Sequence, residues 1–203
     1  MKLSPTQHYF TVHPKCKKKK YKFNATILGL KLEFITASGI FSPREIDMGS
    51  YTLMLHMQLR ARQRVLDLGC GYGAIGIVAA KLFRSSEIVL VDINERAVSC
   101  ARGNIKTNGV TNAVAKQSFF FSGLKNELFD VILLNPPQTA GLDTCYKLIE
   151  GSLDHLNSGG SLQMVVRRRK GGERLSQKME EVFGNVEVIG KKAGYWVYKS
   201  VKD

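Results

Sequence analysis

The sequence predicts an α/β fold with a mainly parallel β-sheet, helices on both faces and an antiparallel hairpin at the end of the chain. From residue 64 onward, apolar strand-like runs alternate with helical patterns, which is typical of a parallel sheet. A glycine-rich loop joins the first of these strands to the first of these helices. The last two apolar runs, at 186–189 and 195–198, have no helix between them, so we expect them to pair as a hairpin.

We expect two segments of one domain, an N-terminal region over 1–60 and the alternating unit over 61–203. Within the N-terminal region, apolar runs at 26–28 and 30–34 predict a strand pair that turns at Gly29. Two glycine-containing pairs are expected in connections between elements: Asn108-Gly109 and Gly159-Gly160.

Apolar residues at helical spacing predict the helices. One short helix is expected over 47–57, a second directly after the glycine-rich loop, and three more at 95–106, 142–156 and 173–183. The residues expected to face inward are, in that order, Tyr51, Met54 and Leu55; Ile75, Val78, Ala79, Leu82 and Phe83; Ala97, Val98, Ala101 and Ile105; Leu142, Cys145, Ile149 and Leu153; Leu175, Met179 and Val182.

Composition agrees with one compact domain in a reducing compartment. The chain has 203 residues with 44% hydrophobic content, no apolar run of membrane-spanning length and no signal-peptide pattern at its start. The four cysteines show no paired spacing, which argues against a disulfide framework and indicates a cytoplasmic protein. The four histidines show no metal-ligand spacing, so we assign no metal.

A net charge of +13 indicates a polyanionic partner, with nucleic acid first and an anionic membrane surface second. The charge is clustered in a lysine block over 15–22 and an arginine block of Arg167, Arg168 and Arg169 with Lys170. The alternative for either block is solvated surface charge, and the lysine block also suits a targeting signal, so RNA contact stays open there. RNA contact is favoured for the arginine block, because it follows the fifth strand of the alternating unit at the edge where ligands bind.

The glycine-rich loop at 67–73 predicts a small-molecule site. Its glycines, Gly69, Gly71 and Gly73, let a ligand approach the backbone, and the helix that follows offers free N–H groups. Asp92 ends the next strand, 19 positions after Gly73 (92 minus 73), where an acid can hold the hydroxyls of a ribose. The run 71–76 also satisfies the dinucleotide fingerprint of nicotinamide oxidoreductases. Asp67 inside the first strand end and the motif described next argue against that class.

Asn135-Pro136-Pro137-Gln138 follows the apolar strand at 129–134. Proline biases the residue before it toward an extended conformation, so Asn135 and Pro136 are held extended just past the strand. Neither proline has an N–H, and the segment therefore presents carbonyl oxygens and one amide side chain. Such a surface suits the binding of an NH₂ group.

These motifs together resemble the class I S-adenosylmethionine-dependent methyltransferases that modify NH₂ groups. The likeness is closest to the small-subunit ribosomal RNA guanine-N2 methyltransferase family and its stand-alone archaeal relatives. Further matching segments extend it over nearly the whole chain: residues 8–10, 39–42, 46–50, 140–141 and 194–197. The resemblance implies a Rossmann-like, seven-stranded sheet, S-adenosyl-L-methionine as cofactor and structured RNA as substrate.

The resemblance also implies roles for residues at the matching positions. Asp67 and the loop glycines would hold the methionine part of the cofactor and Asp92 the ribose, and Cys70, Ile93 and Asn135 would also contact the cofactor. Asn135, Pro136 and Pro137 would be catalytic, with the Asn135 side-chain oxygen and the Pro136 carbonyl holding the target amine. Two positions depart from the family pattern. Gln138 replaces an aromatic residue that stacks on the base, and 117–119 lacks an acid for the adenine, so Ser118 or a backbone group must serve. The substrate would be met by Phe41, Gln138, Arg167, Arg168 and Arg169.

The predicted reaction is methyl transfer to an exocyclic amine of RNA, most simply guanine N2 in ribosomal or transfer RNA. Adenine N6 is an open alternative, because it is also an exocyclic amine. Protein-glutamine methylation also uses Asn-Pro-Pro, but its neutral substrate does not need a chain this basic. An RNA-binding protein with a vestigial site is the remaining alternative, against which the intact set of Asp67, Asp92 and Asn135 argues. The oligomeric state is left open.

Overall fold

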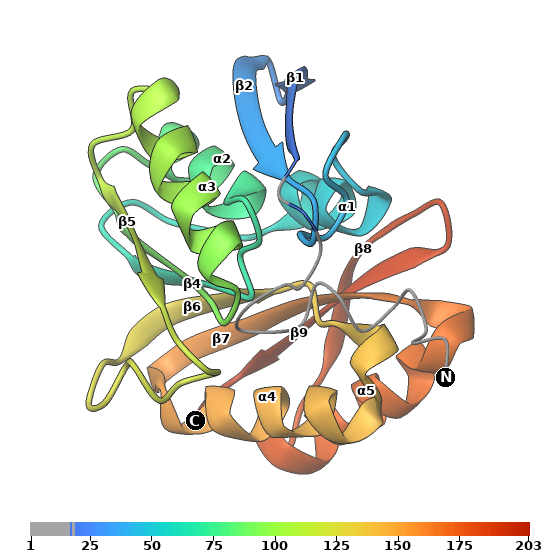
Figure 1. The fold of residues 1–203 in the computed structure, drawn as a ribbon. Helices are drawn as coiled ribbons and strands as arrows, with labels where there is room; N and C mark the ends of the chain where they lie inside the picture. Colours follow the sequence, from blue (N-terminus) through green and yellow to red (C-terminus); the bar gives the residue numbers. More distant parts are fainter. Residues whose placement is uncertain (1–16, 18) are drawn as a thin grey trace.

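A computed structural model describes residues 17 and 19–203 (Figure 1). It confirms the predicted α/β architecture, with a seven-stranded sheet in the order β5-β4-β3-β6-β7-β9-β8. The strands of this sheet are β3 (Arg64–Leu68), β4 (Glu87–Asp92), β5 (Ala113–Gln117), β6 (Phe129–Leu134), β7 (Leu156–Arg167), β8 (Glu187–Lys192) and β9 (Tyr195–Val201).

Strands β3 to β7 run parallel to one another, and β9 runs antiparallel to both β7 and β8. The predicted C-terminal hairpin is therefore confirmed. Strand order reverses between β3 and β6, because β4 and β5 extend the sheet to one side of β3 while β6 and β7 extend it to the other. Ligands of open α/β sheets bind at such a reversal, beyond the carboxyl ends of the strands.

Helices cover both faces of the sheet (Figure 1). On one face lie α4 (Leu142–Asp154) and α5 (Glu173–Phe183), and on the other lie α1 (Met48–His56), α2 (Ala74–Leu82) and α3 (Glu95–Thr107). Each layer has its own apolar core: Ile77, Val78 and Leu90 belong to the first cluster, and Ile132, Ile149 and Met179 to the second. Burial of apolar side chains on both faces of the sheet is the main stabilising term for this architecture.

The N-terminal region forms a separate two-stranded sheet, β1 (Lys20–Ile27) and β2 (Leu30–Ala37). Both residues of its turn, Leu28 and Gly29, have positive φ, as a two-residue hairpin turn requires. Two side-chain amides, one in α3 and one at its C-cap, bind the outer edge of β2. Asn104 bonds the N–H and C=O of Ile35 at 2.8 and 2.9 Å, and Asn108 bonds those of Glu33 at 3.0 and 2.8 Å. These four bonds fix the hairpin over the helix that follows β4.

Several boundaries and burial predictions need correction. The strand pair is longer than predicted, at Lys20–Ile27 and Leu30–Ala37. Helix α4 ends at Asp154, and Leu156 opens β7. The pair Gly159-Gly160 lies inside β7, where the register with β6 shifts, so it is not a connection. The chain does not turn at these glycines, which instead accommodate an irregularity within the strand.

Two helices bury different faces from those predicted. Leu82 is 40% exposed, and α2 is buried on all sides from Ala74 to Ala80. Helices α1 and α3 and the β1–β2 hairpin cover the outer side of α2, so it carries no solvent face over these turns. In α1, Leu53 is fully buried although it was not predicted to face inward, and Leu55 is only partly buried.

Candidate active site

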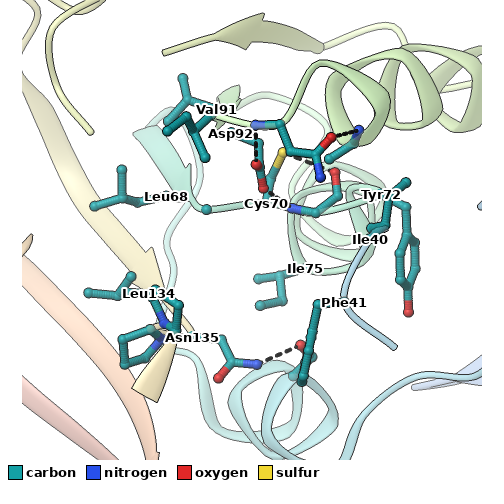
Figure 2. Close-up of a pocket in the computed structure, with 18 of the residues that line it drawn as sticks. Ile40, Phe41, Leu68, Cys70, Tyr72, Ile75, Val91, Asp92, Leu134 and Asn135 are labelled. Atoms are coloured by element: carbon teal, nitrogen blue, oxygen red, sulfur yellow. Dashed lines mark hydrogen bonds between the residues drawn. The ribbon is translucent and has the colours of Figure 1, made fainter. Parts of the chain in front are cut away.

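A cavity, partly open to solvent, lies at the carboxyl ends of β3, β4 and β6 (Figure 2). It coincides with the reversal of strand order, where the fold predicts a ligand. Its walls include the 40–50 stretch before and at the start of α1, the glycine loop after β3, the end of β4, the segment after β5, and the strand end at Asn135. The predicted site residues in its lining are Phe41, Gly69, Cys70, Gly71, Asp92, Ile93, Ser118, Asn135, Pro136 and Pro137.

The glycine loop is pinned to the end of β4. The N–H groups of Gly69 and Cys70 both donate to the carbonyl of Val91 at 2.9 Å, and the N–H of Gly71 donates to Asp92 Oδ2 at 2.8 Å. Gly69 and Gly71 have φ of 73° and 57°, and a Cβ at either position would meet nothing within 4 Å. Glycine is required here by backbone conformation, and the open space above it leaves the loop accessible to a ligand.

Asp92 lies at the cavity wall with both oxygens engaged by backbone N–H groups. Oδ1 accepts from Asn94 at 2.8 Å, and Oδ2 accepts from Gly71. Burial raises the pKa of Asp92 to about 6, while the backbone hydrogen bonds oppose that shift. Since a carboxylate oxygen accepts more than one hydrogen bond, Asp92 retains capacity for ligand hydroxyls.

Asp67 and Gly73 lie behind the cavity and not in its lining. Asp67 is 1% exposed, its Oδ2 accepts the N–H of Gly76 at 2.8 Å, and its Oδ1 has no hydrogen-bond partner among the described residues. Burial, with a smaller contribution from the negative charge of Asp92, raises the pKa of Asp67 to about 7. Gly73 caps α2 with φ of 92°. Both residues shape the loop from beneath.

The Asn135 amide is held by two side chains from α1 and its cap. Its Nδ2 donates to Asp47 Oδ1 at 3.2 Å and to Ser50 Oγ at 3.0 Å. Figure 2 shows Asn135 beneath Leu134, with its amide nitrogen joined by a dashed line on the side where Phe41 lies. Both N–H groups of the amide are committed, so the Oδ1 atom is the part of this side chain that can accept a hydrogen bond from a ligand.

The two prolines turn the chain sharply. Pro137 has φ of −73° and ψ of 73°, and the N–H of Gln138 donates to the Pro136 carbonyl at 2.8 Å. This is an inverse γ-turn. The Pro136 carbonyl keeps one lone pair for a second donor.

Gln138 contacts the first residue of the arginine block. Its Oε1 accepts the N–H of Arg167 at 3.2 Å. Arg167 is the last residue of β7, so the arginine block begins within the strand and not, as was predicted, after it. The guanidinium of Arg168 lies 4.4 Å from the ring centroid of Trp196, over which the Lys191 ammonium lies at 4.0 Å. Arg169 is exposed. A second hollow is lined by Arg168, Arg169, Gly171, Glu173 and Arg174.

The remaining predicted residues lie around the rim. Phe41 is 44% exposed and lines the cavity across from Asn135 (Figure 2). Ser118 lines it as well, but its hydroxyl donates to the carbonyl of Phe120 at 2.8 Å and accepts the N–H of Gly123 at 3.0 Å. Its backbone N–H donates to the carbonyl of Asp92 at 3.0 Å. The segment 8–10 and Cys16 lie outside the described residues.

The prediction from sequence missed the individual roles of Asp47, Ser50 and Asn94. Asp47 and Ser50 bind the Asn135 amide, and Asn94 Nδ2 donates to the carbonyl of Gly39 at 2.7 Å, which ties the N-terminal region to the end of β4. The spacing of Asp47 and Ser50 is a helix-capping signal, and Asp47 Oδ1 accepts the N–H of Ser50 at 3.0 Å. A capping signal in the sequence does not show that these side chains contact Asn135, which follows β6.

Over residues 17 and 19–203, no helix is long and apolar enough to cross a membrane. In the same part of the chain, no three or more His, Cys, Asp or Glu side chains gather as a metal-binding group would require.

Comparison with known proteins gives a consistent result. The model of the family described as "Methyltransferase small domain" matches residues 31–199. The Bacillus subtilis protein YbxB, described as uncharacterized, is 35% identical over 97% of this chain and 99% of its own length. The Escherichia coli ribosomal RNA small subunit methyltransferase C is 34% identical over 82% of this chain and 48% of its own.

Among solved structures, the T. thermophilus 16S rRNA N2 G1207 methyltransferase (RsmC), in complex with AdoMet and guanosine, matches with a TM-score of 0.82 and 29% identity, covering 91% of this chain and 51% of that one. A methyltransferase from Pyrococcus furiosus matches with a TM-score of 0.65 and 25% identity, covering 74% of this chain and 80% of its own. The chain spans about half the length of the ribosomal RNA methyltransferases that it matches.

The cavity suits S-adenosyl-L-methionine on its own chemistry. The open glycine turn leaves room beside the backbone, Asp92 offers carboxylate oxygens for ribose hydroxyls, and Ile93 and Phe120 add apolar wall for an adenine ring. Because the family model spans most of the sequence and the site fits the cofactor, the chain belongs to the methyltransferase small domain family and is an RsmC-like, S-adenosyl-L-methionine-dependent methyltransferase.

Proposed function

We propose that this protein methylates an exocyclic amino group of a base in structured RNA, and that the target is guanine N2 in ribosomal or transfer RNA. The observation that carries the proposal is the state of the Asn135 amide. Its two N–H groups are bound to Asp47 and Ser50, and its acceptor oxygen remains for a ligand at the cavity. An amide held in this way is suited to accept a hydrogen bond from an NH₂ group.

The chemistry of an aryl amine explains why such acceptors are needed. The lone pair of the amine is delocalised into the ring, so the amine is a poor nucleophile. We infer that Asn135 Oδ1 and the Pro136 carbonyl each accept one N–H of the target. These acceptors draw the nitrogen toward tetrahedral geometry and stabilise the positive charge that develops on it. The bound cofactor supplies a methyl group already activated by a sulfonium. Positioning can therefore provide most of the acceleration, and the proton leaves to water.

The cofactor roles follow from the contacts of the loop. Asp92 would bind the ribose, with Ile93 beside it, and the Gly69–Cys70–Gly71 backbone would border the methionine part. Asp67 and Gly73 would act indirectly, because they fix α2 and the loop from below the cavity. Since the Ser118 hydroxyl is engaged within its own turn, its backbone is the better candidate to face the adenine.

RNA as substrate is supported by charge and by relatives. The net charge is +13, and the arginine block lies at the end of β7, joined to the Asn-Pro-Pro segment through the bond between Gln138 and Arg167. Phosphate groups entering this edge would meet Arg167, Arg168 and Arg169 next to the cavity. The named relatives that act on ribosomal RNA support the same substrate class. A target base inside a helix must be flipped out or already unpaired to reach Asn135.

Incubation with labelled S-adenosyl-L-methionine and total RNA from cells lacking this protein tests the proposal. We expect label in N2-methylguanosine when the RNA is digested to nucleosides and measured by mass spectrometry. Label in N6-methyladenosine would reassign the base. Label only in protein would overturn RNA as the acceptor.

A further inference from the structure

The Asp47 carboxylate lies beside the Asn135 amide and lines the same cavity. Its Oδ1 accepts two hydrogen bonds, from the Ser50 N–H at 3.0 Å and from Asn135 Nδ2 at 3.2 Å. Its Oδ2 takes part in no hydrogen bond with any residue that the structure describes. Asp47 is partly exposed, so this second oxygen is not sealed in the core. The Asp47 carboxylate and the Asn135 amide, which is proposed to hold the target amine, therefore line the same cavity and contact each other.

We propose that Asp47 and Asn135 form a recognition site for the Watson–Crick edge of guanine, in which Asp47 Oδ2 accepts the N1–H while Asn135 Oδ1 accepts an N–H of the N2 amine. The inference rests on the proposed amine methylation and adds what selects the base.

The hydrogen-bonding edges of the two purines make the site selective. Guanine carries two adjacent donors, the N1–H and the N2 amine. Adenine carries its N6 amine beside an unprotonated N1, which is an acceptor. A carboxylate has acceptors only, so it binds the guanine edge and faces the lone pair of adenine N1 with no hydrogen between them. A site built to accept a substrate N–H discriminates strongly against a base that lacks it, since the bound base covers the acceptor and leaves it unpaired.

The position of Asp47 is fixed by the backbone. Asp47 is the N-cap of α1, with φ of −69° and ψ of 152°, and its capping bond to Ser50 sets the orientation of the carboxylate. The N-terminus of α1 also carries the positive end of the helix dipole, which stabilises a carboxylate there. A Cβ at Gly49 would approach Asp47 Oδ1 to 3.0 Å, so the glycine keeps the space beside the carboxylate open. The acceptor pair is thus built into the helix start.

Nucleoside binding tests the proposal directly. The protein is saturated with S-adenosylhomocysteine, and affinities for guanosine and 2-aminopurine riboside are measured by titration. Both nucleosides carry the 2-amino group, but only guanosine has the N1–H. A hydrogen bond to a charged acceptor corresponds to a preference of roughly 10- to 100-fold, so we expect wild type to bind guanosine more tightly by that factor.

The informative variant is Asp47→Asn, since asparagine also caps helices and its side-chain oxygen can still accept the Ser50 N–H. Its NH₂ group can donate to N1 of 2-aminopurine, so we expect the preference for guanosine to vanish or reverse. Glu45→Gln is the matched control: it removes a carboxylate from an exposed position in the same stretch, outside the cavity lining, and should keep the preference.

Equal affinities in wild type, an undiminished preference in Asp47→Asn, or no measurable guanosine binding by wild type would each overturn the proposal. The proposed function fails separately. If wild-type protein methylates no amine in the RNA assay, the proposed function is contradicted. If wild type forms N2-methylguanosine but Asp47→Asn keeps the full preference for guanosine, only the role of Asp47 is contradicted.

Discussion

The Asn135 side-chain nitrogen lies 3.2 Å from Oδ1 of Asp47, a residue 88 positions earlier in the chain. This contact joins the cap of α1 to the end of β6 and leaves the acceptor oxygen of Asn135 for the cavity. The N-terminal region therefore does more than cover the sheet, since it determines which atom of the amide a ligand meets.

Gly49→Ala should impair catalysis through this contact. A Cβ at Gly49 would stand 3.0 Å from Asp47 Oδ1, 3.2 Å from Tyr195 Cε1 and 3.3 Å from Asn135 Nδ2, so the neighbours must move. Misplacement of the reacting groups by a few tenths of an ångström is enough to lower the rate, and we expect a roughly 10- to 100-fold fall in kcat with the affinity for S-adenosyl-L-methionine unchanged. Methyl transfer to RNA and calorimetry of cofactor binding measure the two quantities.

Gly103→Ala is the control for helix propensity. Gly103 is exposed in α3, and a Cβ there would meet nothing within 4 Å. Alanine stabilises a helix by about 1 kcal/mol relative to glycine, so Gly103→Ala should raise stability and leave kcat unchanged. Equal activities of the two variants would show that the space around Asn135 is not critical.

Asp67→Asn should change the pH dependence of stability. The pKa of Asp67 is about 7 in the folded protein against an ordinary value of 3.8, so the folded state binds more protons between these values. Wild type therefore loses stability as pH rises from about 4 to 7, and the asparagine variant lacks this term. The free energy of unfolding is measured in urea without cofactor at pH 5, 6, 7 and 8. As pH rises, the stability of the variant relative to wild type should increase. Parallel pH profiles would mean that Asp67 does not titrate in this range.

Arg169→Ala should weaken RNA binding in a salt-dependent way. Loss of one phosphate contact reduces the slope of log K against log salt concentration by about 1. Arg84→Ala removes the same charge from an exposed position after α2, at the opposite edge of the sheet, and should leave the slope unchanged. Titration of a labelled ribosomal RNA transcript at several salt concentrations compares them. Equal slopes for both variants would remove the arginine block from the RNA interface.

Much of the fold could be predicted from sequence because its signals are local. The helices over Glu95–Thr107 and Glu173–Phe183 agree with prediction within one residue, since apolar spacing and end signals mark them. Asn94 caps the start of the first helix and Gly109 follows its end, while Gly172 and Gly184 flank the second. The exposed Leu82 could not be predicted in this way. Burial of α2 depends on what packs over it, which is decided by the β1–β2 hairpin far away in sequence.

The candidate site shows the same contrast between local signals, which could be predicted, and long-range contacts, which could not. The loop glycines, Asp92 and Asn135 were found because each follows a strand, and strand ends of a parallel sheet meet at one edge. The sequence does not reveal the roles of Asp47 and Ser50, since their contacts with Asn135 span 88 and 85 positions. Asp67 was expected to touch the cofactor, but periodicity does not reveal whether a residue at a strand end lines a cavity or lies beneath it. The division of the domain at residue 60 stays a prediction.

Asn135→Ala tests the central claim most directly, by comparing cofactor affinity with the rate of methyl transfer in the same preparation. The account predicts cofactor binding close to wild type in calorimetry, because Asn135 would hold the target amine and Asp92 with the glycine loop would hold the cofactor. It predicts a fall in methyl transfer of roughly 10²- to 10³-fold, the effect of removing one preorganised group that stabilises developing charge. Turnover near the wild-type rate would contradict the account, because no role in amine activation would then remain for Asn135.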